Sequence, residues 1–538
     1  MKLKKYSKIL PKNFIMNQEK FRVLFIYPNF PLSNMLLPAG VSTLSAVLKE
    51  NGIETKLFDT TLYVDEKETF DDFRVSINQL KRSTLKTFAP AKNVNAMNDF
   101  KQLLQEFKPN LIGLSVLEDT FPIALDFVKE AHRQNVPVIA GGIHPTFSPE
   151  VVIKEDCIDM LCVGEGENAL LSLCKAMAKN ENYENIPNLW IKRPNGEIIK
   201  NQIGPLVNVD ELPYPDYHLF DPERFFRPMQ GKVLRILPIE MHRGCPYQCT
   251  FCEDPSLNVL YKSIGENYHR AKSARRLIDE IKYFVEEFQA NYIYFNAETF
   301  FAMPSKVFAE LADLYPKEIG LPFWLQTRPE TITEERVGML KQMNVSNINI
   351  GLEHGNEEYR ARVLKRRMAN QRIINSLQLL ENANIPVTVN NIMGYPDETR
   401  ELIFDTIELN REVSTATINA FLYNPYKGTE LYDVCLEKGY LPKEGDEKTV
   451  DISLSTEGYA YFKTVLNMPT ISKQELMGLQ KTFVLYAKLP KYEFPRIKIA
   501  EKNNEEGLKM FSELSEEYSD VLAGIKQLET SVKEYLQA

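Results

Sequence analysis

Short apolar runs alternate with amphipathic stretches in two separate blocks of this 538-residue chain. The strands expected in the first block are Arg22–Tyr27, Glu54–Phe58, Leu111–Val116, Pro137–Ala140 and Met160–Val163. Those expected in the second block are Val233–Met241, Tyr292–Phe295, Pro322–Thr327, Ile348–Leu352, Pro386–Ile392 and Thr417–Tyr423. Because helices between strands return the chain to the same edge of a sheet, this alternation favours two parallel sheets.

The two blocks differ in architecture. The first resembles a doubly wound, Rossmann-like sheet, whereas strands in the second recur about every 32 residues, the size of a βα unit. The second block is therefore expected to form a partial (β/α)6 barrel of the TIM type. The expected divisions are a flexible tail (1–20), the doubly wound domain (21–180, with an insertion at 60–98), a proline-rich linker (181–232), the barrel (233–435) and a helical C-terminal region (436–538).

Composition excludes some classes of function. The net charge of −9 argues against a general nucleic-acid binder, because phosphate binding requires a basic surface. We find no apolar run of about 18 residues, so a transmembrane segment is not expected. The basic start of the chain is not followed by the apolar stretch of a secretory signal, and we therefore expect a cytoplasmic protein.

Three of the seven cysteines, Cys245, Cys249 and Cys252, lie within eight residues directly after the first strand of the second block. Barrel enzymes carry their active sites at this end of the strands. Three thiolates would leave one iron of a four-iron cluster open, whereas structural zinc sites need four ligands, usually in paired C-x2-C units. The alternatives are cysteines that are neighbours by chance, or a zinc site completed by His242.

The spacing C-x3-C-x2-C resembles the hallmark of the radical SAM superfamily. The resemblance implies a [4Fe-4S] cluster on the three cysteines, whose free iron binds the amine and carboxylate of S-adenosylmethionine (SAM). It further implies that an electron from the cluster breaks the S–C5′ bond. Tyr247 and Phe251, which lie between the cysteines, are expected to border the SAM site.

Other segments that resemble superfamily motifs follow the later strands in the expected order. Glu298, in Asn296–Glu298, is expected to meet the SAM amine, and Glu353 is expected to contact SAM. Arg328 could meet the SAM carboxylate or a substrate anion, and Gly394 would let the backbone approach the adenosine. Two alternatives remain: Glu298 could be neutralised by a nearby Lys or Arg, and Arg328 could belong to a structural ion pair. A further segment, Pro425–Thr429, resembles the P-x-x-G-T element.

The first block resembles the cobalamin-binding domain that is fused to many radical SAM enzymes. The residues expected to contact cobalamin lie at strand ends, where doubly wound sheets bind ligands: Ser115, Gly141, Gly142, His144, Gly164 and Glu165. The D-x-H-x-x-G motif of many cobalamin proteins is absent. His144 could be an axial ligand or an ordinary loop residue, and the domain could also have kept the fold while losing cobalamin.

These resemblances imply a cobalamin-dependent radical SAM methyltransferase acting on an unactivated carbon. The first alternative is an oxidative cyclase or a rearrangement without net methyl transfer, as in the anaerobic Mg-protoporphyrin ester cyclase group. The second is a non-catalytic Fe–S or corrin-binding protein. The expected partners are a small-molecule, lipid or tetrapyrrole-like substrate and an external electron donor of the flavodoxin or ferredoxin type, with no nucleic acid.

Overall fold

The computed structural model describes residues 20–30, 36–63, 70–81, 95–229, 232–413, 416–442 and 464–519. The expected flexible tail therefore lies almost wholly outside the described residues. Parts of the expected insertion at 60–98 and of the C-terminal region lie outside them as well.

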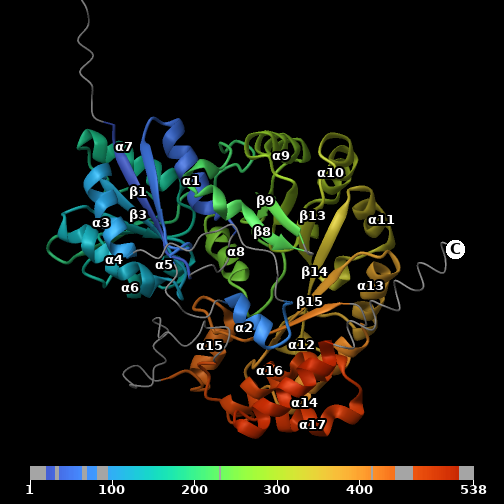
Figure 1. Cartoon of the computed structure of the whole chain (residues 1–538). Helices are drawn as coiled ribbons and strands as arrows, with labels where there is room; N and C mark the ends of the chain where they lie inside the picture. Colours follow the sequence, from blue (N-terminus) through green and yellow to red (C-terminus); the bar gives the residue numbers. More distant parts are fainter. Residues whose placement is uncertain are drawn as a thin grey trace, which may run out of the picture.

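The first sheet has the strand order β2-β1-β3-β4-β5-β6-β7. Its first five strands are parallel, as expected: β1 (Arg22–Tyr27), β2 (Glu54–Asp59), β3 (Leu111–Ser115), β4 (Val138–Gly141) and β5 (Met160–Cys162). Helices cover both faces of this sheet: α1 (Ala39–Glu50), α3 (Ala96–Phe107), α4 (Phe121–Arg133), α5 (Ile143–Phe147), α6 (Pro149–Val152) and α7 (Glu167–Lys179). Helix α1 packs with α7 and α3 packs with α4, which confirms the doubly wound, Rossmann-like arrangement (Figure 1).

This sheet extends beyond residue 180, where the first domain was expected to end. Strands β6 (Leu189–Lys192) and β7 (Ile198–Lys200) continue it in antiparallel pairing. A tight turn at Gly196, whose φ is +85°, joins the two strands. The proline-rich segment expected to be a linker thus contributes a hairpin to the first sheet.

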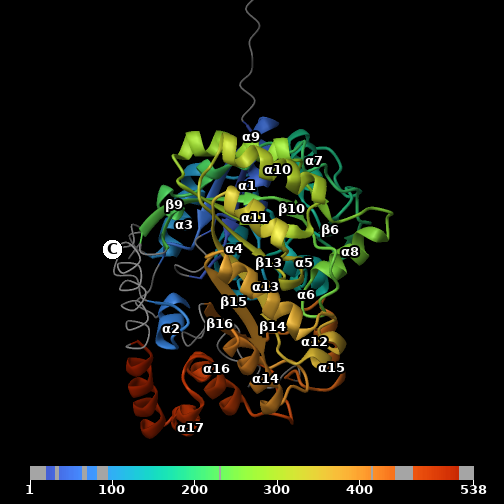
Figure 2. The ribbon, with the colours of Figure 1, turned by 90° about the vertical axis from the view of Figure 1, so that its right-hand side faces the viewer.

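The second sheet has the order β16-β15-β14-β13-β12-β9-β8. Its six parallel strands are β9 (Lys232–Glu240), β12 (Tyr292–Asn296), β13 (Phe323–Thr327), β14 (Val345–Glu353), β15 (Val387–Met393) and β16 (Thr417–Leu422). Strand β8 (Phe226–Met229) pairs antiparallel with β9. The order leaves β8 and β16 at opposite edges of a curled sheet, which confirms a partial barrel of six βα units with one additional edge strand (Figure 2).

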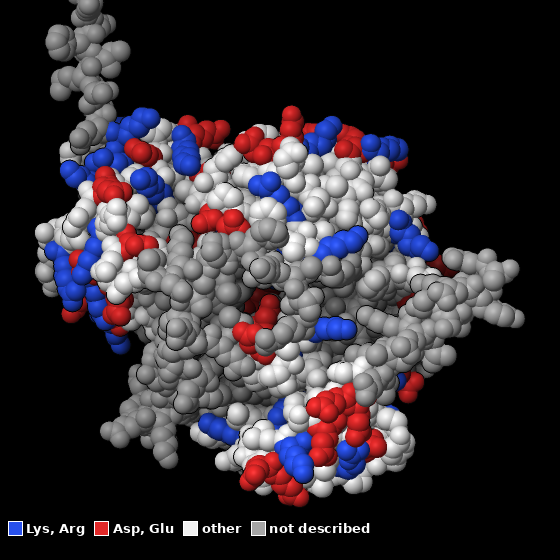
Figure 3. Space-filling model, viewed as in Figure 1, with Lys and Arg blue, Asp and Glu red and all other residues white. Residues whose placement is uncertain are grey.

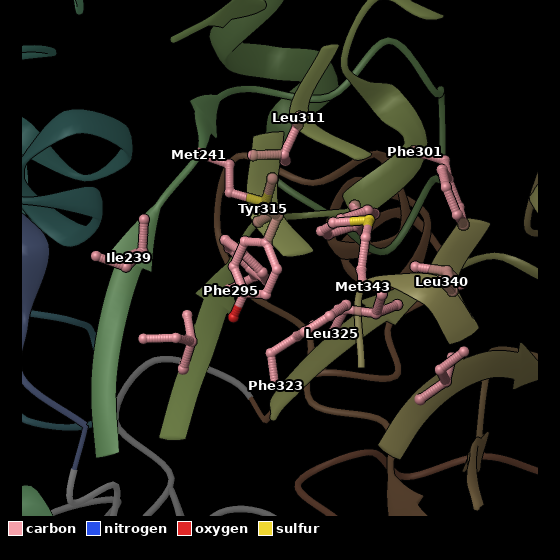
Figure 4. Packing of buried hydrophobic residues seen from close by; sticks show 14 of the residues in the cluster. Ile239, Met241, Phe295, Phe301, Leu311, Tyr315, Phe323, Leu325, Leu340 and Met343 are labelled. Carbon is pink, nitrogen blue, oxygen red and sulfur yellow. The ribbon is translucent and has the colours of Figure 1, made fainter. Parts of the chain in front are cut away.

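Helices pack on the outside of the curled sheet: α9 (Ala274–Phe288), α10 (Ser305–Glu318), α11 (Glu334–Gln342), α13 (Asn370–Asn382) and α14 (Arg400–Arg411). Three more helices follow strand ends: α8 (Asp254–Lys262), which contacts the first domain, α12 (Glu357–Arg362) and α15 (Glu430–Glu437). Alternate side chains of each strand point outward into this layer, as for Ile239, Phe295 and Leu325 in Figure 4. Ser273 caps the start of α9: its side-chain hydroxyl accepts the N–H of Arg276. A small two-stranded antiparallel sheet, β10 (His242–Arg243) and β11 (Arg270–Ala271), follows β9 and encloses the cysteine loop and α8 in sequence.

Three further helical segments follow the barrel: α16 (Lys473–Lys488), α17 (Phe494–Ala500) and residues 505–519. They bury an apolar layer against α14 and β16. On the face shown in Figure 3, described acidic and basic side chains are interspersed. Among the described residues, no helix is both long enough and apolar enough to cross a membrane.

Candidate functional site

The three cysteines lie in the loop between β10 and α8, above the carboxyl end of β9. Cys245 and Cys249 are buried, and Cys252 is partly exposed. Burial raises the pKa of the Cys245 thiol to about 12 and also raises that of Cys252. These thiols would therefore be deprotonated by metal coordination rather than by their surroundings alone.

Two buried arginines approach Cys249, one from the end of β13 and the other from the loop between α12 and α13. Nη1 of Arg328, directly after β13, lies 3.0 Å from the Cys249 sulfur, and Nη1 of Arg366 lies 3.8 Å from it. The Arg328 guanidinium also stacks 3.9 Å from the ring centre of Tyr247 and pairs with Glu330. Arg328 therefore contacts the cysteine loop and also forms an ion pair with Glu330. A structural ion pair was the alternative role considered for this residue.

The donor set fits an iron–sulfur cluster better than a single metal ion. Among the described residues, no group of three or more His, Cys, Asp or Glu side chains surrounds one point at metal-ion distance. A four-iron cluster needs no such point, because each cysteine binds a different iron. Nε2 of His242 lies 3.1 Å from the Thr299 carbonyl, so the zinc site completed by His242 receives no support.

Glu298 follows β12 and lies on the wall between the barrel and the first domain. Its side chain is exposed to the cavity described below, and none of the described Lys or Arg residues forms an ion pair with it. Burial among protein atoms raises the pKa of Glu298 to about 8, and carboxylates including Asp254 and Glu240 act in the same direction. The alternative for Glu298, neutralisation of its carboxylate by a neighbouring Lys or Arg, is therefore not seen among the described residues. A carboxyl group with a raised pKa would favour a cationic ligand.

Glu353 ends β14 with a left-handed backbone, φ +70°, where the register with β15 shifts. Its carboxylate lies over Gly351, where a Cβ would be only 2.2 Å from Oε1. The same oxygen is 3.9 Å from Nη1 of Arg366. Burial raises the pKa of Glu353, and Arg366 opposes that rise. Glu353, which is expected to contact SAM, therefore lies near the arginines that approach Cys249.

Gly394 lies in the turn after β15 with a positive φ of +83°. A Cβ at this residue would be 2.6 Å from the Leu476 side chain, so the missing side chain makes room for α16, and the approach of the Gly394 backbone to the adenosine stays a prediction. Its backbone N–H donates to Glu398, whose Oε1 lies 3.0 Å from Nε2 of the buried His354. Nδ1 of His354 accepts the N–H of Asn356, so the ring proton is on Nε2, facing Glu398.

Phe251 packs its ring 5.8 Å from that of Tyr395, within a small apolar cluster next to the cysteine loop. It is thus placed by packing against the turn that holds Gly394. A contact between Phe251 and SAM stays a prediction.

A cavity of about 260 Å³ lies between the two domains. From the first domain it is lined by strand-end residues, among them Gly113, Ser115, Gly141, Gly142, Gly164 and Glu165. From the barrel side it is lined by Glu240, His242, Arg243, Gly244, Tyr268 and Glu298. Five of the six residues expected to contact cobalamin therefore border one cavity, which also reaches Glu298.

The glycines at these strand ends leave no room for side chains. A Cβ at Gly142 would be 2.7 Å from the Val116 carbonyl, and one at Gly164 would be 2.4 Å from the Tyr261 hydroxyl. Bare backbone at strand ends suits a large flat ligand. The cavity, lined by glycines of the first domain and by polar side chains of the barrel, fits part of a cobalamin molecule, with the remainder outside its volume.

His144 does not border this cavity, and a contact between His144 and cobalamin stays a prediction. It is buried in α5, with its ring 5.2 Å from that of Phe121. Burial lowers the pKa of His144 to about 4, so the ring is neutral near pH 7. Gly142 precedes helix α5, and His144, the second residue of that helix, has its ring buried in the first domain.

Glu165 lines the cavity, but its carboxylate faces the barrel. It pairs with Arg270 and lies 3.2 Å from Nη1 of Arg243, which also lies 2.7 Å from Glu167. Sequence reasoning missed Arg243, Arg270 and Arg366. The position of Arg243 two residues before Cys245 was a usable signal, whereas Arg366 is distant in sequence from its partners.

Comparisons with known proteins agree with this geometry. Residues 239–409 match the family model described as Radical SAM superfamily, and residues 84–173 match the B12 binding domain. An uncharacterized methyltransferase of Pyrococcus horikoshii is 23% identical over 401 residues, which cover 73% of this chain and 82% of that relative. The anaerobic magnesium-protoporphyrin IX monomethyl ester cyclase of Rubrivivax gelatinosus is 23% identical over 431 residues, covering 76% and 69% of the two chains.

A solved structure shares the fold. The radical S-adenosylmethionine methyltransferase TsrM from Kitasatospora setae, with cobalamin and a [4Fe-4S] cluster bound, superimposes with a TM-score of 0.55 and 17% identity. The match covers 78% of this chain and 75% of that one.

Proposed function

The chain belongs to the radical SAM superfamily and carries a B12-binding domain, and from this premise we propose that it methylates an unactivated carbon of its substrate. The observation that carries the proposal is the cavity bordered both by the strand-end glycines and by Glu298. Methyl transfer of this kind requires cobalamin, SAM and substrate to meet in one enclosed space, and a cavity between the two domains meets that requirement.

Different residues of the chain would bind the different cofactors. Cys245, Cys249 and Cys252 would hold the cluster, and Glu298 would bind the amine of SAM. When bound, the cluster supplies single electrons to SAM and the corrin carries a methyl group. Arg328 would meet the SAM carboxylate, because its guanidinium already lies beside Cys249.

Buried ion pairs would keep water out of this space. Arg243 is bound to Glu165 and Glu167 of the first domain on one side and to Glu240 of the barrel on the other. These contacts hold the two domains together next to the cysteine loop. Excluding water from the site protects reactive species from quenching.

The overall reaction replaces a C–H hydrogen by a methyl group. One SAM gives its methyl group and leaves as S-adenosylhomocysteine, while a second takes up the hydrogen atom and leaves as 5′-deoxyadenosine and methionine. The balance requires two electrons and no net proton. We propose that an external donor of the flavodoxin or ferredoxin type supplies them.

The second candidate is ring closure or oxidation without methyl transfer. It is supported by the similarity to the Rubrivivax gelatinosus cyclase, of which this chain covers 69%. Membership of the radical SAM superfamily makes the chain an enzyme, which sets aside the non-catalytic hypothesis.

Product analysis separates the two candidates. The enzyme, purified and reconstituted without air, would be incubated with dithionite, a small-molecule and lipid extract, and SAM deuterated in its S-methyl group. A product that carries the label, formed together with S-adenosylhomocysteine and 5′-deoxyadenosine, supports methylation. Formation of 5′-deoxyadenosine without S-adenosylhomocysteine supports the second candidate, and a Cys249→Ala variant controls for reactions that need no cluster.

A further inference from the structure

Tyr268 brings an aromatic ring to the barrel side of the cavity between the two domains. The residue lies in the loop between α8 and β11, and its side chain is partly exposed. Two other barrel residues that line the cavity are held by protein groups: Nε2 of His242 lies beside the Thr299 carbonyl, and Arg243 is paired with carboxylates. Tyr268 is therefore the ring through which the barrel can contact a ligand in the cavity.

Neighbouring residues fix the Tyr268 ring in place before any ligand binds. The ring stacks on that of Tyr261 in α8, with centres 5.2 Å apart and planes 6° from parallel. Gly244 has a φ of +79°, and a Cβ there would be only 2.7 Å from Cδ1 of Tyr268, so the glycine before Cys245 makes room for this ring. The Arg270 guanidinium lies 5.7 Å from the ring centre. A ring held in this way loses little conformational entropy when a ligand packs against it.

Tyr261 connects the same pair of rings to the first domain. Its hydroxyl accepts the backbone N–H of Glu165 at 2.6 Å. A Cβ at Gly164, one of the cavity-lining glycines, would be 2.4 Å from that hydroxyl. Figure 1 shows α8, which carries Tyr261, between the first domain and the barrel. The two stacked rings therefore lie at the domain boundary, between the residue that precedes Cys245 and a strand end of the first domain.

The shape of the cavity favours the corrin ring as the group that reaches Tyr268. Its volume of about 260 Å³ is smaller than most pockets that enclose a whole organic ligand, so cobalamin must extend along the domain boundary. The first-domain wall includes apolar side chains of the sheet and of α1, among them Phe25, Leu44 and Ile139. The corrin, as the widest part of cobalamin, fits the boundary between the domains better than the interior of one of them. A flat macrocycle there gains from packing on a rigid aromatic ring.

We propose that Tyr268 contacts the corrin ring of cobalamin from the barrel side, and that Tyr261 and Gly244 hold the Tyr268 ring in position for this contact. The residues expected from the sequence to contact cobalamin all belong to the first domain, so Tyr268 adds a contact from the domain that carries the cysteines. The inference concerns cofactor binding and is independent of which of the two candidate reactions the enzyme catalyses.

Binding of two corrins to full-length protein tests the contact. Protein reconstituted with its cluster but without corrin would be titrated with hydroxocobalamin and with cobinamide, which has the corrin ring but lacks the nucleotide. Quenching of the fluorescence of the two tryptophans by the corrin follows binding. Tyr268→Leu should weaken binding of both corrins by about tenfold, because it removes the aromatic contact. Tyr268→Phe keeps the ring and should bind both corrins as the parent protein does.

Tyr214→Leu is the matched control, because Tyr214 packs against Tyr283 and Phe284 and does not line the cavity. It should leave the affinity for both corrins unchanged. Iron content and thermal denaturation show that each variant keeps its cluster and its fold.

A second measurement needs no disruptive variant. Fluorine NMR of protein labelled with 3-fluorotyrosine gives one signal for each tyrosine environment, and Tyr268→Phe identifies the signal of Tyr268. Hydroxocobalamin should shift this signal, because the corrin would lie against the ring, and should leave the signal of Tyr214 in place.

Affinity for cobinamide that Tyr268→Leu leaves intact would overturn the inference, since a loss confined to hydroxocobalamin would place the nucleotide at Tyr268. An unshifted Tyr268 signal would overturn it as well, and this signal decides the matter if Tyr268→Leu fails to fold. Neither measurement uses SAM or a reductant. Corrin contact without any methylated product would therefore overturn only the proposed function, and methylated product without the contact would overturn only this inference.

Discussion

Nη1 of Arg243 lies 2.7 Å from Oε1 of Glu167, and this buried ion pair joins the barrel to the first domain. Arg243 precedes Cys245 by two residues, and Glu167 begins α7, next to the cavity-lining Gly164. This contact, together with the pairing of Glu165 with Arg243 and Arg270, holds the cysteine loop against the strand end that borders the cavity.

Arg243→Gln should lower the free energy of unfolding by about 3–5 kcal/mol, because it leaves Glu165, Glu167 and Glu240 without their shared cation. Chemical denaturation measures the effect. Arg193→Gln, which breaks an exposed pair with Glu184, serves as the control and should cost about 1 kcal/mol or less. Equal losses in the two variants would contradict the importance of the contact between the domains.

Cys249→Ala should abolish the iron–sulfur cluster, because two remaining thiolates cannot hold it stably. Iron and sulfide content and visible absorbance, measured on protein purified without air, check this. Cys435→Ala, at a buried cysteine outside the loop, should keep the full iron content. A Cys249→Ala protein with the iron and sulfide content of the parent would rule out the assignment of this ligand.

Arg366→Gln should make the reduction potential of the cluster more negative by tens of millivolts, since it removes a cation 3.8 Å from the Cys249 sulfur. The buried Glu353 carboxylate also loses its counter-charge, which acts in the same direction. Potentiometric titration followed by EPR gives the shift. Arg366→Lys keeps the charge and should fall between the two; a potential unchanged in Arg366→Gln would show that this cation does not tune the cluster.

In protein prepared without the cluster, where the SAM amine stays an ammonium group, SAM binding should release a proton below pH 8, and Glu298→Gln should abolish this release. The pKa of Glu298 is raised from 4.5 to about 8, so the carboxyl is protonated at neutral pH, and a bound ammonium group would stabilise the ionised form and expel the proton. Calorimetry in buffers with different ionisation enthalpies counts the protons. Glu310→Gln, on the exposed face of α10, should match the parent enzyme. Proton release that persists in Glu298→Gln would assign it to another group.

The sheets were predictable from the sequence because each strand shows its own pattern of buried side chains. Segments such as Leu111–Ser115 and Phe323–Thr327 lie where their apolar runs predict. The extent of the first sheet was not predictable, because the hairpin of β6 and β7 lies in a proline-rich segment without a periodic pattern. Glu298 and Glu353 were expected at the site because their segments resemble superfamily motifs that follow the strands, and the structure places both at strand ends.

Other parts of the site depend on residues that are distant in sequence. Arg366 reaches Cys249 across 117 residues, and Tyr261 reaches Glu165 across 96. Leu476 fills the space beside Gly394 from a helix near the C-terminus. No local pattern reports which side chain will occupy a given space.

The sequence by itself determined the two α/β blocks, the cysteine triplet and the glycines at the strand ends, because periodicity and spacing act over a few neighbouring residues. Only the tertiary structure decided that His144 turns into the protein, that Arg243 joins the domains and that Tyr268 borders the cavity. Those outcomes depend on how whole helices and strands pack, and packing selects among many arrangements that satisfy the same local pattern.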